Sequence, residues 1–176
     1  AVGDLVEGVG VFPGQEDSLV ILDVREQYRI LARYLNMIRK DISIILCPGD
    51  HDAVRSSHPQ SILPKSLASE LWEIKNVILV TNPSMINIHS TLEFSGFNIL
   101  LYHGHGFHYF VDNVETLRKG NALENPRMIM KFLLQRRHLA PAHTSTVYVP
   151  DTRYDPLVID TVPDIFVSGN LHHSDF

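Results

Sequence analysis

The sequence is poor in cysteine, in long apolar runs and in surplus positive charge, and each shortage excludes a class of protein. A single cysteine, Cys47, excludes an internal disulfide framework and is typical of a reducing cytosol, so we expect a cytoplasmic protein with Cys47 in its core. No run reaches the roughly eighteen apolar residues that a membrane span needs, so we expect no membrane partner. The net charge of −5 does not favour a free-standing nucleic-acid binder, although a larger partner can present a nuclease to DNA.

The length predicts one globular domain with a hydrophobic core, over residues 1–176. The first four residues, Ala1 to Asp4, read as the end of a strand, and no basic segment followed by an apolar run marks a secretory signal. We therefore expect a partial domain, truncated at its N-terminus and at its C-terminus.

Hydrophobic periodicity predicts a helix over 23–40, with Asp23 as its N-cap, and then a buried strand over 42–47. Strand, helix and strand with short connections form a parallel α/β unit, which places ligands at the carboxyl ends of its strands. The remaining expected elements are a strand over 76–81, a hairpin pairing 92–94 with 97–102, helices over 110–119 and 126–138, a loop over 143–156 and a strand over 164–168.

Residues that can bind metal ions, namely Asp, His or Asn, follow four of the predicted strands, at 3–4, 49–52, 103–104 and 169–172. The ten histidines also cluster, and imidazole is both a transition-metal ligand and an acid near neutral pH. A two-metal hydrolase needs an anionic bridging ligand, further oxygen and imidazole ligands and a proton donor near the leaving oxygen. The candidate ligands are Asp4, Asp50, His103, Asn170 and His172, and the candidate proton donor is His51.

The order of these motifs, Gly-Asp, Gly-(Asn)-His-Asp, His-Gly and Gly-(His)-x-His, resembles that of the calcineurin-like metallophosphoesterases. Five flanking segments are similar to one branch, the small subunits of archaeal D-family DNA polymerases, and the resemblance covers nearly the whole chain. The segments are 3–15, 48–55, 102–104, 137–141 and 162–166, which read GDLVEGVGVFPGQ, PGDHDAVR, YHG, RHLAP and VPDIF.

This resemblance implies an α/β metallophosphoesterase sandwich of mixed β-sheets flanked by helices. It also implies a 3′-to-5′ exonuclease that proofreads DNA for a large catalytic polymerase subunit and uses two divalent metal ions, manganese or else magnesium. By the same resemblance, Asp4 matches the bridging aspartate and His51 the catalytic histidine. His103 matches a ligand of the second metal, and His172 a ligand of the first.

Two positions depart from the family's pattern. Asp50 stands where the family has asparagine and Asn170 where it has histidine, both at the second metal. We expect these changes to compensate in part, giving a harder and more anionic site that favours Mn²⁺ or Mg²⁺. The family's Asp-x-His motif, expected upstream of Ala1, is not in this sequence, so we expect the fragment alone not to assemble a working centre.

Four of the five candidate ligands also have a structural interpretation. Asp4 can be a turn residue, Asp50 the cap of a short helix from Ala53, His103 a hydrogen-bonded core histidine and Asn170 a turn residue.

The basic residues Arg127 and Lys131 share one face of the helix predicted over 126–138. They either guide a DNA strand or form a solvated face.

The function classes left open are an exonuclease core, a non-catalytic scaffold that binds the large subunit, and a protein or small-molecule phosphatase. The phosphatases share the metal motifs but not the flanking segments.

Overall fold

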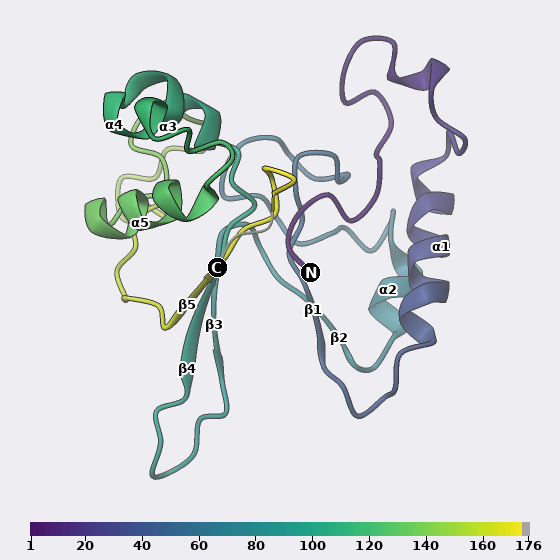
Figure 1. Ribbon diagram of the computed structural model, residues 1–176. Coiled ribbons are helices and arrows are strands. Elements are labelled where there is room, and N and C mark those ends of the chain that lie inside the picture. Colours follow the sequence, from purple (N-terminus) through teal and green to yellow (C-terminus); the bar gives the residue numbers. More distant parts are fainter. Residues whose placement is uncertain (174–176) are drawn as a thin grey trace.

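The computed structural model describes residues 1–173 as a mixed α/β fold with two small sheets and helices beside each (Figure 1). The first sheet pairs β1 (Ile44–Leu46) with β2 (Val77–Leu79) in parallel. The second has the order β3-β4-β5, formed by β3 (Ser84–Ile88), β4 (Phe97–Leu101) and β5 (Ile165–Val167). Within it β4 runs antiparallel to β3 and parallel to β5. The expected α/β class with mixed sheets is confirmed, whereas the calcineurin-like sandwich stays a prediction.

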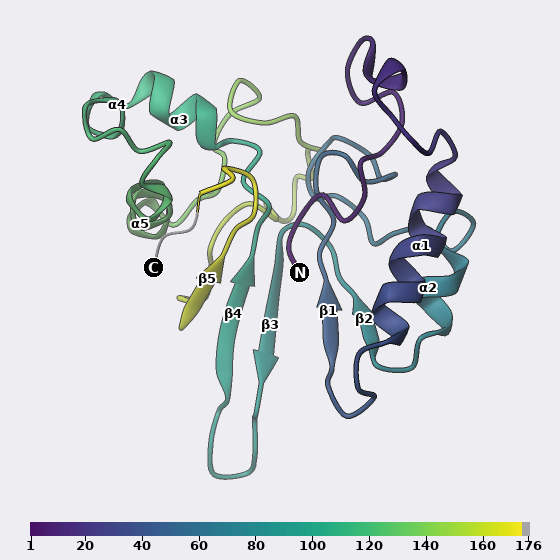
Figure 2. The ribbon, with the colours of Figure 1, turned by 45° about the vertical axis from the view of Figure 1, so that its right-hand side comes forward.

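The first sheet packs against α1 (Val24–Asn36) and α2 (Ser69–Glu73), which lie together on one side of it (Figure 2). The Asp23 carboxylate accepts a hydrogen bond from the Arg25 N–H at 2.8 Å, which confirms Asp23 as the N-cap. Tyr28 and Ala32 face the core of this half. The helix ends at Asn36 and not at residue 40, because its last turn tightens before the chain reverses into β1.

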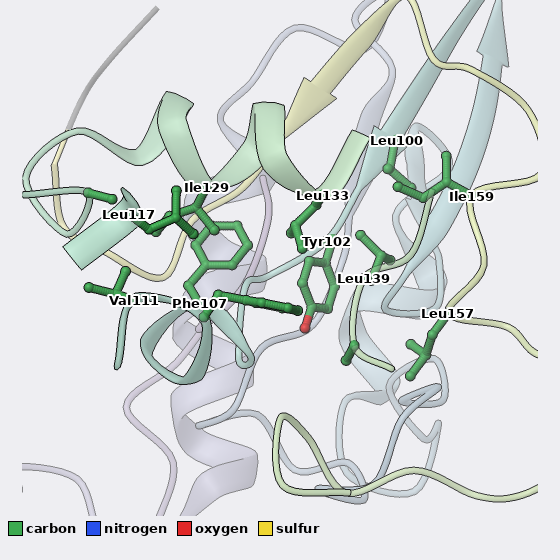
Figure 3. Packing of buried hydrophobic residues seen from close by; sticks show 13 residues of the cluster. Leu100, Tyr102, Phe107, Val111, Leu117, Ile129, Leu133, Leu139, Leu157 and Ile159 are labelled. Atoms are coloured by element: carbon green, nitrogen blue, oxygen red, sulfur yellow. The ribbon is translucent and has the colours of Figure 1, made fainter. Parts of the chain in front are cut away.

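The second sheet packs against α3 (Phe107–Asn113), α4 (Glu115–Lys119) and α5 (Pro126–Arg136). A short 3₁₀ helix, η1 (Gln15–Asp17), precedes α1. Figure 3 shows the core of this half, where the rings of Tyr102 and Phe107 meet the aliphatic side chains of α5. Ile129 and Leu133 are fully buried. The opposite face of α5 is exposed, so the predicted amphipathic pattern of this helix is confirmed.

The predicted hairpin has the right second strand but the wrong first one. β4 pairs with β3, in a register that sets Ser84 opposite Leu101 and Ile88 opposite Phe97. Residues 92–94 lie instead in the connection, where the Thr91 N–H donates to the Phe94 carbonyl and closes a turn. Leu92 is completely exposed in this turn, as a residue paired in the sheet would not be.

Two expectations about helices are also corrected. The helix predicted over 110–119 is two helices, because Val114 adopts an extended backbone conformation between α3 and α4. No helix begins near Ala53, where residues 51–54 form successive bends, so Asp50 caps none. Cys47 is buried, as expected. Within residues 1–173, every helix is too short or too polar to cross a bilayer.

Candidate functional site

The candidate ligands follow strands that run in the same direction. Val2 forms a parallel bridge with Cys47, so Asp4 emerges beside the turn that carries Asp50. His103 comes two residues after β4, and Asn170 three residues after β5, which is parallel to β4. These carboxyl ends meet at one edge of the molecule, as the sequence predicts.

Three of the five candidate ligands surround the imidazole of His103. The Nε2 atom of His103 lies 3.5 Å from Asp4 Oδ1, 3.6 Å from Asp50 Oδ2 and 3.1 Å from Asn170 Nδ2. The His103 side chain is fully buried, and its Nδ1 atom has no hydrogen-bond partner within residues 1–173. The Nε2 atom therefore faces two anionic oxygens that are too far away for hydrogen bonds.

Glycine is required beside two of these ligands because the chains approach closely. A Cβ atom on Gly3 would lie 1.8 Å from Nδ1 of His103. A Cβ atom on Gly49 would lie 2.2 Å from the backbone nitrogen of Asp4. Gly3 thus lets the His103 ring lie directly against the Asp4 segment, and Gly49 lets the Asp4 backbone lie directly against the Asp50 turn.

The backbone of His103 is held on both sides. Its N–H donates to Asn82 Oδ1 at 3.0 Å, and its carbonyl accepts from the Ser168 hydroxyl at 2.7 Å. Burial lowers the pKa of the His103 imidazole below its ordinary value, and the carboxylates of Asp50 and Asp4 oppose this only in part. His103 is therefore neutral, the form in which histidine binds metal ions.

His51 is held by the segment that carries Asp4. The His51 N–H donates to Asp4 Oδ1 at 2.9 Å, and its ring Nδ1 lies 3.0 Å from the Glu7 carbonyl oxygen. A carbonyl only accepts hydrogen bonds, so Nδ1 carries the proton in this contact. Nε2 is then the atom through which His51 can exchange a proton with a substrate.

His105, to which the sequence assigns only a lining or surface position, contacts a candidate ligand. Its Nδ1 lies 2.8 Å from Asp50 Oδ2, and this contact raises the pKa of His105. Burial pushes the pKa of Asp50 upward, but the hydrogen bond and charge of His105 outweigh it and leave the pKa below its ordinary value. Asp50 is therefore ionised, with one oxygen fixed by His105. The only signal in the sequence is the alternation His-Gly-His.

A buried polar network, which the sequence does not predict, contacts the backbone of His103 through Asn82. We call it the inner network, and its members are His58, Gln60, Asn82 and Thr146. The amide of Asn82 donates to Gln60 Oε1 at 2.5 Å, and Gln60 donates to the Gly49 carbonyl at 3.3 Å. The Thr146 hydroxyl lies 3.0 Å from Nδ1 of His58. Asn82 thus connects the backbone of His103 with the turn of Asp50.

Asp52 fixes the same turn from the other side. Its Oδ2 accepts from the N–H groups of Leu5 at 3.0 Å and Gly49 at 2.9 Å, and its Oδ1 accepts from the Tyr28 hydroxyl at 2.9 Å. Burial raises the pKa of Asp52, although these three hydrogen bonds oppose the shift. Asp52 therefore joins the Asp4 segment, the Asp50 turn and α1, and its role is to position them.

The structure does not bring every candidate into this arrangement. His172 is exposed, with a left-handed backbone (φ 52°), and within residues 1–173 it forms no hydrogen bond or ion pair with the other four candidate ligands. Arg127 and Lys131 are exposed on α5. Their role in DNA binding stays a prediction.

The donors suit a hard divalent cation in kind. Two carboxylates, an imidazole and an amide are ligands that Mn²⁺ and Mg²⁺ accept. Their positions do not form a ready metal site, because no group of three or more His, Cys, Asp or Glu side chains within residues 1–173 is placed so that it could hold a metal ion.

The sequence matches known proteins over nearly its whole length. The family of DNA polymerase alpha/epsilon B subunits matches residues 22–176. Three similar proteins, each named DNA polymerase II small subunit, align with 97% of this chain. They come from Methanocaldococcus jannaschii (44% identity), Methanothermobacter thermautotrophicus (38%) and Archaeoglobus fulgidus (39%). The chain spans 27%, 33% and 32% of their respective lengths.

Proposed function

Because this chain belongs to the family of DNA polymerase alpha/epsilon B subunits, we propose that it is the 3′-to-5′ exonuclease core of the small subunit of a replicative DNA polymerase. Its partners are then DNA and the large catalytic subunit. The observation that carries the proposal is the position of Asp4, Asp50 and Asn170 around Nε2 of His103. Four donors from separate strand ends meet there, beside His51, whose ring is fixed by its Nδ1 atom.

In the proposed enzyme, Asp4, Asp50, His103 and Asn170 would have to close around a divalent cation, Mn²⁺ or Mg²⁺, which would supply polarisation of the phosphodiester and a lower pKa for the attacking water. His51 donates a proton through Nε2 to the leaving 3′ oxygen as the phosphorus–oxygen bond breaks, and the attacking water loses its proton to solvent. Asp4 has a second task, because its hydrogen bond from the His51 N–H fixes the distance between the proton donor and the ligands.

The test is Mn²⁺-dependent degradation of single-stranded DNA from its 3′ end by the full-length protein. We expect His51→Ala to lower the rate at least about 100-fold, as loss of a general acid does, and to leave thermal unfolding unchanged. His108→Ala is the matched control, because His108 is an exposed histidine on α3 to which the mechanism gives no task. Equal rates for the wild type and His51→Ala would contradict the proposed mechanism.

A scaffold without catalysis is the second candidate, and the exposed position of His172 favours it. Asp50 and Asn170, which replace the family's asparagine and histidine, point the same way. Under this alternative the full-length protein binds the large subunit tightly but shows no Mn²⁺-dependent degradation. An Asp-x-His motif on a strand of the full-length sequence favours the enzyme, and its absence favours the scaffold.

A further inference from the structure

A hollow of about 600 Å³ lies between the N-terminal segment and α1, next to the candidate ligands. In Figure 1 this is the side where the purple segment arches beside α1. Its lining is mainly apolar and includes Val6, Phe12, Ile21, Ile30 and Tyr34, with Asp4 and Glu7 on the side of the candidate site.

The walls of the hollow are fixed by two buried glutamines. Gln27 exchanges hydrogen bonds with the backbone of Gly8, at 2.9 Å to its N–H and 3.0 Å to its carbonyl. Gln15 accepts from the Val11 N–H at 2.9 Å and donates to the Glu7 carbonyl at 2.8 Å. Both amides therefore hold backbone groups of the walls in place, so the walls are preformed.

The hollow shares Asp4 with the candidate site. Asp4 lines the hollow and also lies 3.5 Å from Nε2 of His103. Phe12 is 50% exposed, and its ring centroid lies 6.4 Å from that of His51. An occupant that reaches both places needs a phosphoryl group at the candidate ligands and a flat apolar body beside Phe12.

We propose that this hollow binds the base of the 3′-terminal nucleotide, with Phe12 as its stacking partner. This inference rests on the proposed exonuclease function and adds the position of the substrate. Since the lining is mainly apolar and the two glutamine amides are bonded to the backbone, the hollow binds a base mainly by stacking and apolar contact. All four terminal bases are then removed with similar KM values, as an exonuclease of general sequence range requires.

The experiment compares two oligonucleotides, one ending in thymidine and one in an abasic nucleotide, with the full-length protein in complex with its large subunit. For the wild type we expect a KM about tenfold lower for the base-bearing end, the size of one stacking contact. Phe12→Ala should raise that KM about tenfold and leave the abasic KM and both kcat values unchanged. Phe94→Ala is the control, because Phe94 has a similar exposure (43%) and lies far along the chain between β3 and β4.

Each other outcome overturns the inference in a distinguishable way. Wild-type protein that degrades both ends with the same KM would show that no base enters the hollow. A fall in kcat for both substrates in Phe12→Ala would assign Phe12 to the support of His51. Weaker co-purification of Phe12→Ala with the large subunit, at unchanged KM, would assign the hollow to that partner. Degradation of neither substrate by the wild type would instead contradict the proposed function.

Discussion

The polar residues around His103 form two groups that differ in their relation to water. The inner network is buried, and its amide, imidazole and hydroxyl groups bond to one another or to backbone. The second group, which we call the outer cluster, consists of the buried His103 and four residues around it that water reaches, Asp4, Asp50, His105 and Asn170. Its carboxylates are 32% and 24% exposed, and both lie beyond hydrogen-bond distance of the imidazole between them.

This difference suggests separate roles for the two groups, one in supporting the structure and the other in binding a cation or a substrate. A buried polar group whose bonds are all made contributes to rigidity and is costly to remove. A partly hydrated carboxylate has spare acceptor capacity that a cation or a substrate can use. The inner network therefore determines where His103 and the Asp50 turn lie, and the outer cluster carries the chemistry. Variants of the two groups should consequently affect different measurements.

The largest effect on stability is expected at Asn82, which is fully buried. Asn82→Ala leaves the His103 N–H and Gln60 Oε1 without partners, and each unsatisfied buried group costs about 1–3 kcal/mol. We expect the free energy of unfolding to fall by about 3–4 kcal/mol, measured by urea denaturation. Asn87→Ala is the control, because Asn87 bonds to the Asn98 side chain on the exposed hairpin, and it should cost less than about 1 kcal/mol. Equal losses would show that the inner network contributes no more to stability than an exposed hydrogen bond does.

The pH dependence of the free energy of unfolding tests whether the inner network excludes water. Burial lowers the pKa of His58 to about 4, against an ordinary value of 6.5. The unfolded chain therefore takes up a proton between pH 6.5 and 4 that the folded protein excludes, and stability present above pH 6.5 is lost as the pH falls through this window. At about 1.36 kcal/mol per unit, the loss is about 3 kcal/mol.

A His58→Gln variant isolates this contribution. It should be less stable at pH 7, but its free energy of unfolding should depend less steeply on pH between 6.5 and 4. Denaturation curves at half-unit intervals measure both slopes. The same slope in both proteins would mean that water reaches His58.

The sequence predicts most of the fold where one element carries a strong local pattern. The helix from Val24 has both an N-cap and an apolar stripe, and the ends of β1 and β4 carry the motifs that meet at His103. The sequence does not reveal β3, because its alternation is short and its exposed positions include Met85, whereas 92–94 stands beside a strong turn signal.

The motifs predicted four of the residues that meet, but not the side chains that hold them or the inner network in place. His105 contacts Asp50 across 55 residues of sequence, and Thr146 contacts His58 across 88. Such contacts follow from tertiary packing and leave no periodic pattern. The motif around His172 predicts a ligand by residue type alone, and the role of His172 in metal binding stays a prediction.

Cation binding is expected to depend on the outer cluster alone. At a hundredfold excess over its Kd, a bound ion stabilises a protein by about 2.7 kcal/mol, so Mn²⁺ should raise the unfolding free energy of the full-length wild type by about this amount. Asp50→Ala should lose most of this gain, and Thr146→Val, although less stable, should keep it. Titration with EDTA should reverse the stabilisation by Mn²⁺ in the wild type and in Thr146→Val. A gain retained by Asp50→Ala would remove Asp50 from the ligands.

The smallest effect is expected at His105, which contacts Asp50 but is 42% exposed. Exposed pairs contribute about 0–1 kcal/mol, so His105→Ala should lower the free energy of unfolding by less than about 1 kcal/mol at about pH 6. Because Asp50 raises the pKa of His105, this stabilisation is present below the ordinary histidine pKa and is lost as the pH rises through the raised value. The cost of His105→Ala should therefore be smaller at about pH 9 than at about pH 6, measured by urea denaturation beside a His108→Ala control. A loss as large as that of Asn82→Ala, or one that grows with pH, would place His105 in the inner network and not in the outer cluster.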